Sequence, residues 1–260
     1  MPVEIVSGST PVIVVLPYTG TNIQRVVQKR LAEPEHAITA PDHYLDRLFD
    51  DLGTEINVLR CNFHRYVSDV NREGVTSGGG AYSGMVSSVP LVDTVGRAIW
   101  SEPPQKTEAA NWRSSHYAPF HAAIGAKIAK IRAKHGHAIL ITCWSLKSGG
   151  PFKDQVIQAD LNLSTHMGGS CDINLAMKLA AIGKAWTDHS CVLNGIKKAG
   201  WITRNYGRPQ IGTHAIDLVL NDACFVSHDA GEGHYDTERA TELRSVLSDI
   251  IAFAANWKPN

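Results

Sequence analysis

Apolar positions follow two alternating patterns along the chain. Short apolar runs rich in β-branched residues predict strands buried on both faces, and polar-apolar alternation predicts one further strand. The predicted strands cover 12–16, 56–59, 65–70, 138–142 and 215–220. Apolar residues three and four positions apart predict helices at 41–53, 119–134, 173–182, 188–198 and 236–257. This alternation favours a mostly parallel sheet with helices on both faces.

The same pattern predicts a single α/β domain over residues 1–260. Residues 74–115 are rich in Gly, Ser and Pro, with SGGGAYSG at 77–84, and predict an irregular excursion because coherent elements resume after them. Ligands of parallel sheets bind beyond the carboxyl ends of the strands. Tyr18, Trp144 and the segment after Leu220 are therefore expected near the site.

Composition narrows the class of partner. The chain has 25 Lys and Arg against 25 Asp and Glu, so it lacks the basic surface that nucleic acid or anionic lipid would require. A small neutral or anionic ligand is expected instead. Its five cysteines form no C-x-x-C pair, which favours a reducing compartment. With no basic leader and no apolar run of about 18 residues, we expect a cytoplasmic protein without a membrane partner.

Two short segments carry candidate chemistry. RYVSDVNRE at 65–73 combines Arg65, Asn71 and Arg72, side chains suited to gripping a carboxylate, although a solvated surface strand would also explain them. VVLPYTGTN at 14–22 runs from a buried strand into a glycine turn, a setting that presents a side chain to a ligand. The side chain presented there is that of Tyr18.

Six segments, in order along nearly the whole chain, resemble the N-formylglutamate amidohydrolase family. They are PYTGT at 17–21, DHYLDRLFDDLG at 42–53, WRSSHYAPFHAAI at 112–124, HGHAILITCWSLKS at 135–148, LNLSTHMGGSCD at 161–172 and GWITRNYGRPQIGTHAIDLVL at 200–220. The resemblance implies a three-layer α/β/α fold of the zinc-exopeptidase type, with a mixed, mostly parallel sheet. It also implies hydrolysis of the formyl amide of N-formyl-L-glutamate in histidine degradation.

In such a site, zinc held by two His and one carboxylate activates water, a Glu moves protons, and Arg and Asn hold the substrate carboxylates. The resemblance places substrate-binding residues at Arg65, Asn71, Arg72, His121, Arg204 and His214. It places the metal-binding carboxylate at Asp46. The two histidine positions are occupied by Tyr18 and Trp144, and the acid/base position by Val219. An indole nitrogen is a donor only, and a phenol with a pKa near ~10 ligates zinc poorly.

The sequence leaves two functions open. One is an amide hydrolase of the N-formylglutamate type or with a related N-acyl amino acid as substrate. The other is a catalytically silent relative that binds an anionic acyl amino acid without cleaving it. A displaced metal site is also conceivable, with His43 and Asp46 at i and i+3 joined by His166, His214 or Cys143.

The glycine-rich segment MGGSC lies between His166 and Asp172. Its backbone N–H groups could meet an anion, or the segment could be an ordinary loop that ends at a helix N-cap on Asp172.

Overall fold

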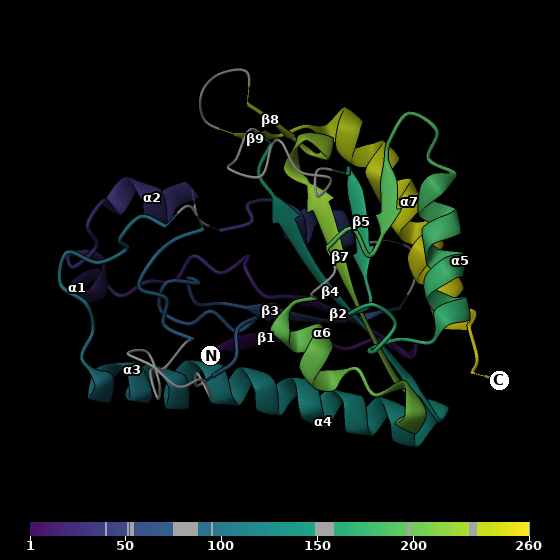
Figure 1. The fold of residues 1–260 in the computed structure, drawn as a ribbon, viewed down its shortest axis with the longest axis horizontal. Helices are drawn as coiled ribbons and strands as arrows, with labels where there is room; N and C mark the ends of the chain where they lie inside the picture. Colours follow the sequence, from purple (N-terminus) through teal and green to yellow (C-terminus); the bar gives the residue numbers. More distant parts are fainter. Residues whose placement is uncertain are drawn as a thin grey trace.

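The computed structural model describes residues 1–39, 41–50, 52, 55–74, 88–94, 96–148, 159–196, 199–228 and 233–259 (Figure 1). The predicted SGGGAYSG loop at 77–84 lies outside the described residues. The centre of the molecule is a twisted sheet with helices packed on both sides (Figure 1).

Seven strands form the central sheet in the order β1-β3-β2-β4-β7-β5-β6. Their bounds are β1 Val3–Val6, β2 Val12–Leu16, β3 Asn57–Cys61, β4 Ala138–Leu146, β5 Leu161–Ser164, β6 Cys191–Leu193 and β7 Thr213–Asn221. Only β1 with β3 and β5 with β7 pair antiparallel, and the other four neighbouring pairs are parallel. A small second sheet pairs β8 Val226–Ser227 with β9 His234–Tyr235.

Over the described ranges, four helices cover the sheet: α4 Ala118–His135, α5 Ile173–Lys184, α6 Trp201–Tyr206 and α7 Thr237–Asn256. The helices α1 Arg25–Gln28, α2 Pro34–Thr39 and α3 Lys106–Trp112 contribute instead to a separate hydrophobic cluster. Residues of α5 and α7 share one hydrophobic core with the sheet, and residues of α4 and α6 share a second core on the opposite face (Figure 1). The three-layer fold with a mixed, mostly parallel sheet is confirmed.

Local chemistry explains where the main elements begin and end. All five side chains of β2 are buried and four of them are β-branched, which suits a strand covered on both faces. The side chain of Asp172 accepts hydrogen bonds from the second and third amides of α5, so the N-cap interpretation of Asp172 is confirmed. Asp236 caps α7 in the same way. The left-handed Gly136 ends α4.

Four sequence predictions are wrong in detail. Residues 65–70 form turns and not a strand, because the His64 ring and backbone accept hydrogen bonds from the amides of Tyr66, Val67 and Ser68. The helix predicted at 41–53 is only the 3-10 turn Leu45–Phe49.

The helix predicted at 188–198 contains the strand β6, whose residues pair with β5. The irregular excursion ends earlier than predicted, because 106–117 are already helical and run directly into α4. Helices α3 and α4 therefore form one long rod along the bottom of Figure 1.

The strand order locates the place where a ligand would bind. From β2 the chain proceeds to β3 on one side, whereas β4 lies on the other side. The carboxyl ends of β2 and β4 therefore meet at a topological switch point, where open α/β sheets bind their ligands. Tyr18 follows β2 by two residues, and Trp144 lies near the end of β4.

Candidate ligand site

Tyr18 and Trp144 meet at the switch point. Their rings contact edge to face, with centroids 6.4 Å apart and an interplanar angle of 81°. Val219 of β7 is the register partner of Trp144, so the three positions of the predicted metal chemistry do come together. A Cβ on Gly20 would lie 2.5 Å from the Phe63 carbonyl oxygen, so only glycine lets this turn approach that loop.

The Arg65 guanidinium stacks on the Tyr18 ring. Its central carbon lies 3.8 Å from the ring centroid, a close cation–π contact. A terminal nitrogen of Arg65 also lies 3.8 Å from Oδ2 of the buried Asp69. Burial, followed by the charge of Asp69, raises the pKa of Tyr18 well above its ordinary value. Tyr18 is therefore a neutral phenol that packs against a cation.

Asp42 contacts both the Tyr18 turn and the end of β4. Asp42 is buried, its amide donates to the Tyr18 carbonyl, and its Oδ2 accepts a hydrogen bond of 2.8 Å from the Ser145 amide. Burial raises the pKa of Asp42 to about 6, although Arg65 opposes the shift. Asp46 instead pairs with Arg60 at 2.8 Å, beside a surface hollow that Asn62 also lines. Asp46 as the metal-binding carboxylate therefore stays a prediction, and Asp42 is a second carboxylate that the structure brings to the Tyr18 turn.

Asp69 organises the predicted carboxylate-binding segment. One of its oxygens accepts from the Asn71 amide, and the other accepts from Arg72 Nε at 2.8 Å. The Arg72 side chain stays 45% exposed, so a solute carboxylate can reach it. Asn71 has another task, because its Oδ1 accepts from the Ile202 amide at the start of α6. Of this segment, Arg72 is the residue most available to a ligand.

His121 is used inside the fold. Its Nε2 bonds the Val70 carbonyl and its Nδ1 bonds the Tyr206 hydroxyl, each at 2.9 Å. Burial lowers the pKa of His121 to about 4, so the ring is neutral at neutral pH. Both ring nitrogens of His121 therefore have partners inside the fold, where they join α4, α6 and the preceding loop, and its contact with substrate stays a prediction.

The remaining two predicted binding residues lie apart. Arg204 is half-buried on α6, and its Nε donates to the Ala199 carbonyl. His214 begins β7 and pairs in register with Ile139, five residues before Val219, which is about 16 Å along a strand. Its Nδ1 accepts from the Asp172 amide and its ring packs on Trp257. His214 is therefore at the wrong end of the sheet to contact a ligand at the switch point.

Below the aromatic pair lies a polar network that the sequence did not reveal. Asp217 of β7 is fully buried and accepts from Thr203 Oγ1 at 2.6 Å and from the Gly200 amide at 2.5 Å. Thr203 in turn contacts Thr142 Oγ1. Burial raises the pKa of Asp217 to about 6, opposed by these hydrogen bonds. The network links α6 to β4 and β7.

Asn162 is the clearest anomaly. It lies on β5 directly opposite Val219 and is completely buried. Within the described part of the chain, neither Nδ2 nor Oδ1 of Asn162 has a hydrogen-bond partner. An unpaired buried amide costs about 1–3 kcal/mol per group. A polar side chain at position 219 would provide the missing partner, and Val219 cannot.

The donors at the switch point do not fit a zinc ion. Zinc in catalytic sites takes three protein ligands from His, Cys, Asp or Glu. Trp144 offers only an N–H and Tyr18 only a neutral phenol oxygen beneath Arg65. Asp42, Asp69 and Asp217 are the carboxylates that act on Tyr18 or Trp144. Each of them already accepts hydrogen bonds within the fold. The zinc that the resemblance implies therefore has no adequate ligand set at this position.

The displaced metal site also fails to form. His43 Nε2 bonds the Ile38 carbonyl, Asp46 pairs with Arg60, and His214 lies at the far end of the sheet. The described residues contain a different group of potential metal ligands: Asp160, His189 and Cys224, whose ligand atoms lie within 4.8 Å of one another. Among the described residues, side chains that could hold a metal ion thus lie together at a place the sequence did not predict.

Comparisons with known proteins identify relatives over almost the whole chain. A profile of the N-formylglutamate amidohydrolase family matches residues 10–226. The N-formylglutamate deformylase of Pseudomonas aeruginosa is 31% identical over 257 residues, covering 96% of this chain and 94% of the relative. The deformylase of Pseudomonas putida is 27% identical, covering the same shares of each chain.

Solved structures agree on the fold. N-formylglutamate amidohydrolase from Ralstonia eutropha superposes with a TM-score of 0.81 at 16% identity, covering 98% of this chain and 97% of the other. A gene product from Agrobacterium tumefaciens gives a TM-score of 0.72 at 15% identity, covering 97% and 94%. Among the described residues, no helix has both the length and the apolar character to cross a bilayer.

Proposed function

Because the chain belongs to the N-formylglutamate amidohydrolase family, we propose that it binds a small anionic N-acyl amino acid of the N-formylglutamate type without cleaving it by metal-assisted hydrolysis. One observation carries this proposal. At the switch point, the Tyr18 and Trp144 rings contact each other and Arg65 covers the Tyr18 face, where a metal site would need two imidazoles.

The binding half of the proposal rests on the arginines. Arg65 and Arg72 both pair with one carboxylate, that of the buried Asp69. Arg72 keeps almost half of its side chain exposed. A guanidinium held by one edge can still present its other nitrogens to a second carboxylate. The ligand we propose carries two carboxylates, which suits such a set.

The proposed lack of cleavage rests on the catalytic groups at the site. Hydrolysis of an amide needs an activated water and a group that moves protons. Val219 offers no proton, and His121 has both nitrogens bonded within the fold. Asp42 and Asp217 are the nearest carboxylates with a pKa of about 6, but each accepts backbone hydrogen bonds that hold it in place.

Calorimetric titration with N-formyl-L-glutamate and with L-glutamate tests binding. We expect Arg72→Ala to weaken binding at least about tenfold, since a charge-assisted hydrogen bond contributes about 1.5–3 kcal/mol. Arg97→Ala is the matched control, because Arg97 is also about half exposed and also pairs with an aspartate at 2.8 Å. Unchanged binding by Arg72→Ala would contradict the proposal that the arginines bind the ligand.

Formate release, measured together with metal content, tests whether the protein lacks hydrolytic activity. The measurement should use Cys224→Ser protein, so that the separate Asp160, His189 and Cys224 group does not contribute bound metal. We expect no stoichiometric zinc and no formate from N-formyl-L-glutamate. Zinc at one ion per chain together with turnover would overturn the silent assignment.

A second candidate is the amide hydrolysis named for the relatives. The 31% identity to a deformylase over nearly the whole chain favours it. The same formate assay decides between the two candidates, since only the hydrolase releases product.

We also propose that the protein works in the cytoplasm. All five cysteines are free, and four of them are buried, which supports a reducing compartment. Nucleic acid and membrane are not proposed as partners, because the chain carries no net charge.

A further inference from the structure

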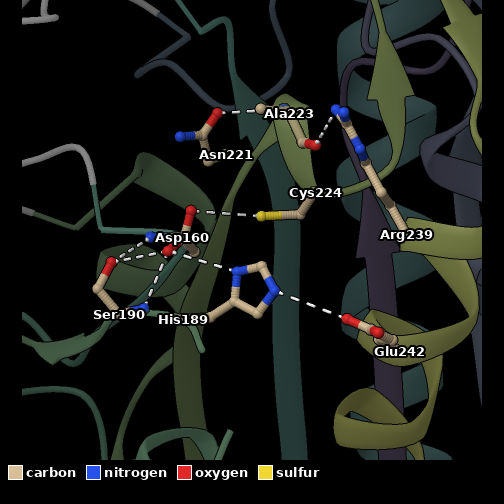
Figure 2. A network of polar contacts seen from close by, with 8 residues as sticks. All are labelled: Asp160, His189, Ser190, Asn221, Ala223, Cys224, Arg239 and Glu242. Atoms are coloured by element: carbon tan, nitrogen blue, oxygen red, sulfur yellow. Dashed lines mark hydrogen bonds and ion pairs between the residues drawn. The ribbon is translucent and has the colours of Figure 1, made fainter. Parts of the chain in front are cut away.

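Asp160, His189 and Cys224 come together from three separate segments. Asp160 immediately precedes β5, His189 lies two residues before β6, and Cys224 lies in the 3-10 turn Asp222–Cys224 that follows β7. The start of β5 lies beside the end of β7, since these two strands are antiparallel, and β6 runs parallel to β5. Figure 2 shows the three side chains pointing toward a common centre.

The spacing of the donor atoms suits a tetrahedral transition-metal ion. Cys224 Sγ lies 3.5 Å from Asp160 Oδ1, and His189 Nδ1 lies 3.6 Å from Asp160 Oδ2. Zinc–sulfur bonds of about 2.3 Å and zinc–nitrogen or zinc–oxygen bonds of about 2.0–2.2 Å, at tetrahedral angles, separate neighbouring donors by about 3.3–3.6 Å. The two distances end on different oxygens of Asp160, and all the donor atoms lie within 4.8 Å of one another, so a bound ion would draw the three side chains closer.

Supporting partners surround the three donors. The second ring nitrogen of His189, Nε2, faces Glu242 Oε2 of α7 at 3.8 Å (Figure 2). The Ser190 amide and hydroxyl both donate to Asp160 Oδ2 at 2.9 Å. A carboxylate behind a ligating histidine, and donors that orient a ligating carboxylate, are features that metal sites use to fix their ligands.

Access and charge also permit an ion. The side chains of Asp160 and His189 are each 26% exposed, whereas Cys224 is buried in the core on the α5 and α7 face. One side of the group therefore opens to solvent, which leaves room for a water as fourth ligand. Arg239 of α7 lies nearby, where its Nη1 donates to the Ala223 carbonyl (Figure 2). The positive charge of Arg239 offsets the negative charge of Glu242. A dication bound to a thiolate and a carboxylate would therefore have surroundings close to neutral.

We propose that Cys224 Sγ, His189 Nδ1 and the Asp160 carboxylate bind one zinc-class dication, which ties the ends of β5, β6 and β7 together. A thiolate, an imidazole and a carboxylate together favour zinc over magnesium or calcium, which take oxygen ligands. The proposal does not depend on the ligand bound at the switch point, because these residues lie on other segments.

Metal analysis and cobalt substitution test the site. Protein stripped with a chelator is titrated with Zn²⁺ and, separately, with Co²⁺, whose absorption reports thiolate ligation directly. We expect one ion per chain and a sulfur-to-cobalt charge-transfer band in the parent. Cys224→Ser should abolish the band, and His189→Gln should weaken Zn²⁺ binding at least about tenfold, as a lost ligand should cost no less than a lost supporting residue.

Two matched variants control for general effects. Cys191→Ser changes the partly exposed cysteine of β6, and His228→Gln changes a histidine that also pairs with an aspartate, Asp222 at 3.2 Å. Both should bind the ions like the parent. Glu242→Ala should retain the charge-transfer band and weaken Zn²⁺ affinity about tenfold, because it removes only a supporting carboxylate.

Several outcomes would overturn the site. A parent protein without a sulfur-to-cobalt band does so on its own, even if Cys224→Ser fails to fold. Equal loss of the band in Cys191→Ser would place the thiolate elsewhere. A hydrogen-bonded cluster without metal would leave the unfolding temperature of the parent unchanged by added Zn²⁺, whereas a bound ion must raise it.

Discussion

Two groups of side chains lie at the same edge of the sheet and differ in the donor atoms that they offer to a metal ion. At the ends of β2 and β4, the aromatic residues Tyr18 and Trp144 contact each other and Arg65. At the ends of β7 and β5, Cys224 and Asp160 stand with His189 as donors about 3.5 Å apart. Position on the fold makes both places suitable for a ligand, but only the donor types decide which ligand binds.

The largest effect should come from replacing the aromatic group at the switch point with side chains that can bind a metal. Tyr18→His, Trp144→His and Val219→Glu, made together in Cys224→Ser protein, should raise zinc affinity from undetectable to a Kd below about 1 μM. Two imidazoles would join Asp42, and the new glutamate would lie opposite Asn162, whose amide lacks a partner. Metal content after dialysis measures the gain.

The same background distinguishes the two candidate carboxylates. Adding Asp42→Asn to the triple variant should abolish the acquired zinc, whereas adding Asp46→Asn should not, because Asp46 pairs with Arg60 outside the site. A triple substitution with phenylalanine in place of both histidines is the control for packing. If the histidine variant gains no metal, the three positions do not form one site.

The next effect concerns what holds the aromatic group together. Asp69→Ala should lower the free energy of unfolding by about 1.5–3 kcal/mol, because it leaves the half-buried Arg65 without this carboxylate and removes the partner of Arg72. Asp50→Ala is the control, since Asp50 is 64% exposed and its contact with Arg60 is long at 3.9 Å. That surface pair should contribute no more than about 1 kcal/mol. Urea denaturation of both variants measures the difference, and equal losses would show that Asp69 is not the organising residue.

The sequence predicted the central elements well because each has a strong local signal. Strands β2, β4 and β7 are apolar on both faces, and α5 and α7 have apolar stripes with an aspartate cap. From these strands alone, Tyr18 and Trp144 could be placed at one edge of a parallel sheet. The likeness to the family then added Val219, and the register of β4 with β7 puts it beside Trp144.

The remaining features depend on tertiary context. Residues 65–70 alternate like a strand, but hydrogen bonds to the His64 ring and backbone hold them in turns. The Asp160 group could not be seen, because it requires β5 to insert antiparallel between β7 and β6. His189 was predicted to lie in a helix, which would have directed it elsewhere. Asp42 and Asp46 are four residues apart, and only the turn after β2 decides which of them faces Tyr18.

A comparable effect should appear as a pH dependence of stability. Burial raises the folded-state pKa of Asp217 from 3.8 to about 6, so the folded protein holds this proton more tightly than the unfolded chain. Its contribution to stability is therefore present in full below about pH 4 and is lost as the pH rises through about 6. A shift of about two units corresponds to roughly 3 kcal/mol at 1.36 kcal/mol per unit.

Two substitutions separate this residue from other titrating groups. Asp217→Asn cannot ionise, so its stability relative to the parent should rise by up to about 3 kcal/mol between pH 4 and pH 7. Thr203→Val should steepen the loss in this range, since Thr203 donates a hydrogen bond to the carboxylate. Unfolding midpoints in urea across this range give both slopes. A constant difference between Asp217→Asn and the parent would mean that Asp217 does not titrate there.

The smallest effect tests whether the apolar side chain at position 219 leaves the buried Asn162 amide without a hydrogen-bond partner. Asn162→Leu has a similar branched shape and removes an amide that, within the described residues, has no hydrogen-bond partner. We expect it to raise the free energy of unfolding by about 1 kcal/mol, because the cost of burying the unpaired amide disappears. In the Val219→Glu background the sign should reverse, since Asn162 would then have a charged partner on the opposite strand. Urea denaturation of the four proteins of this double-mutant cycle gives the coupling energy directly. A stabilising Asn162→Leu in both backgrounds would show that the two side chains never meet, and the aromatic group would then owe its missing metal chemistry to Tyr18 and Trp144 alone.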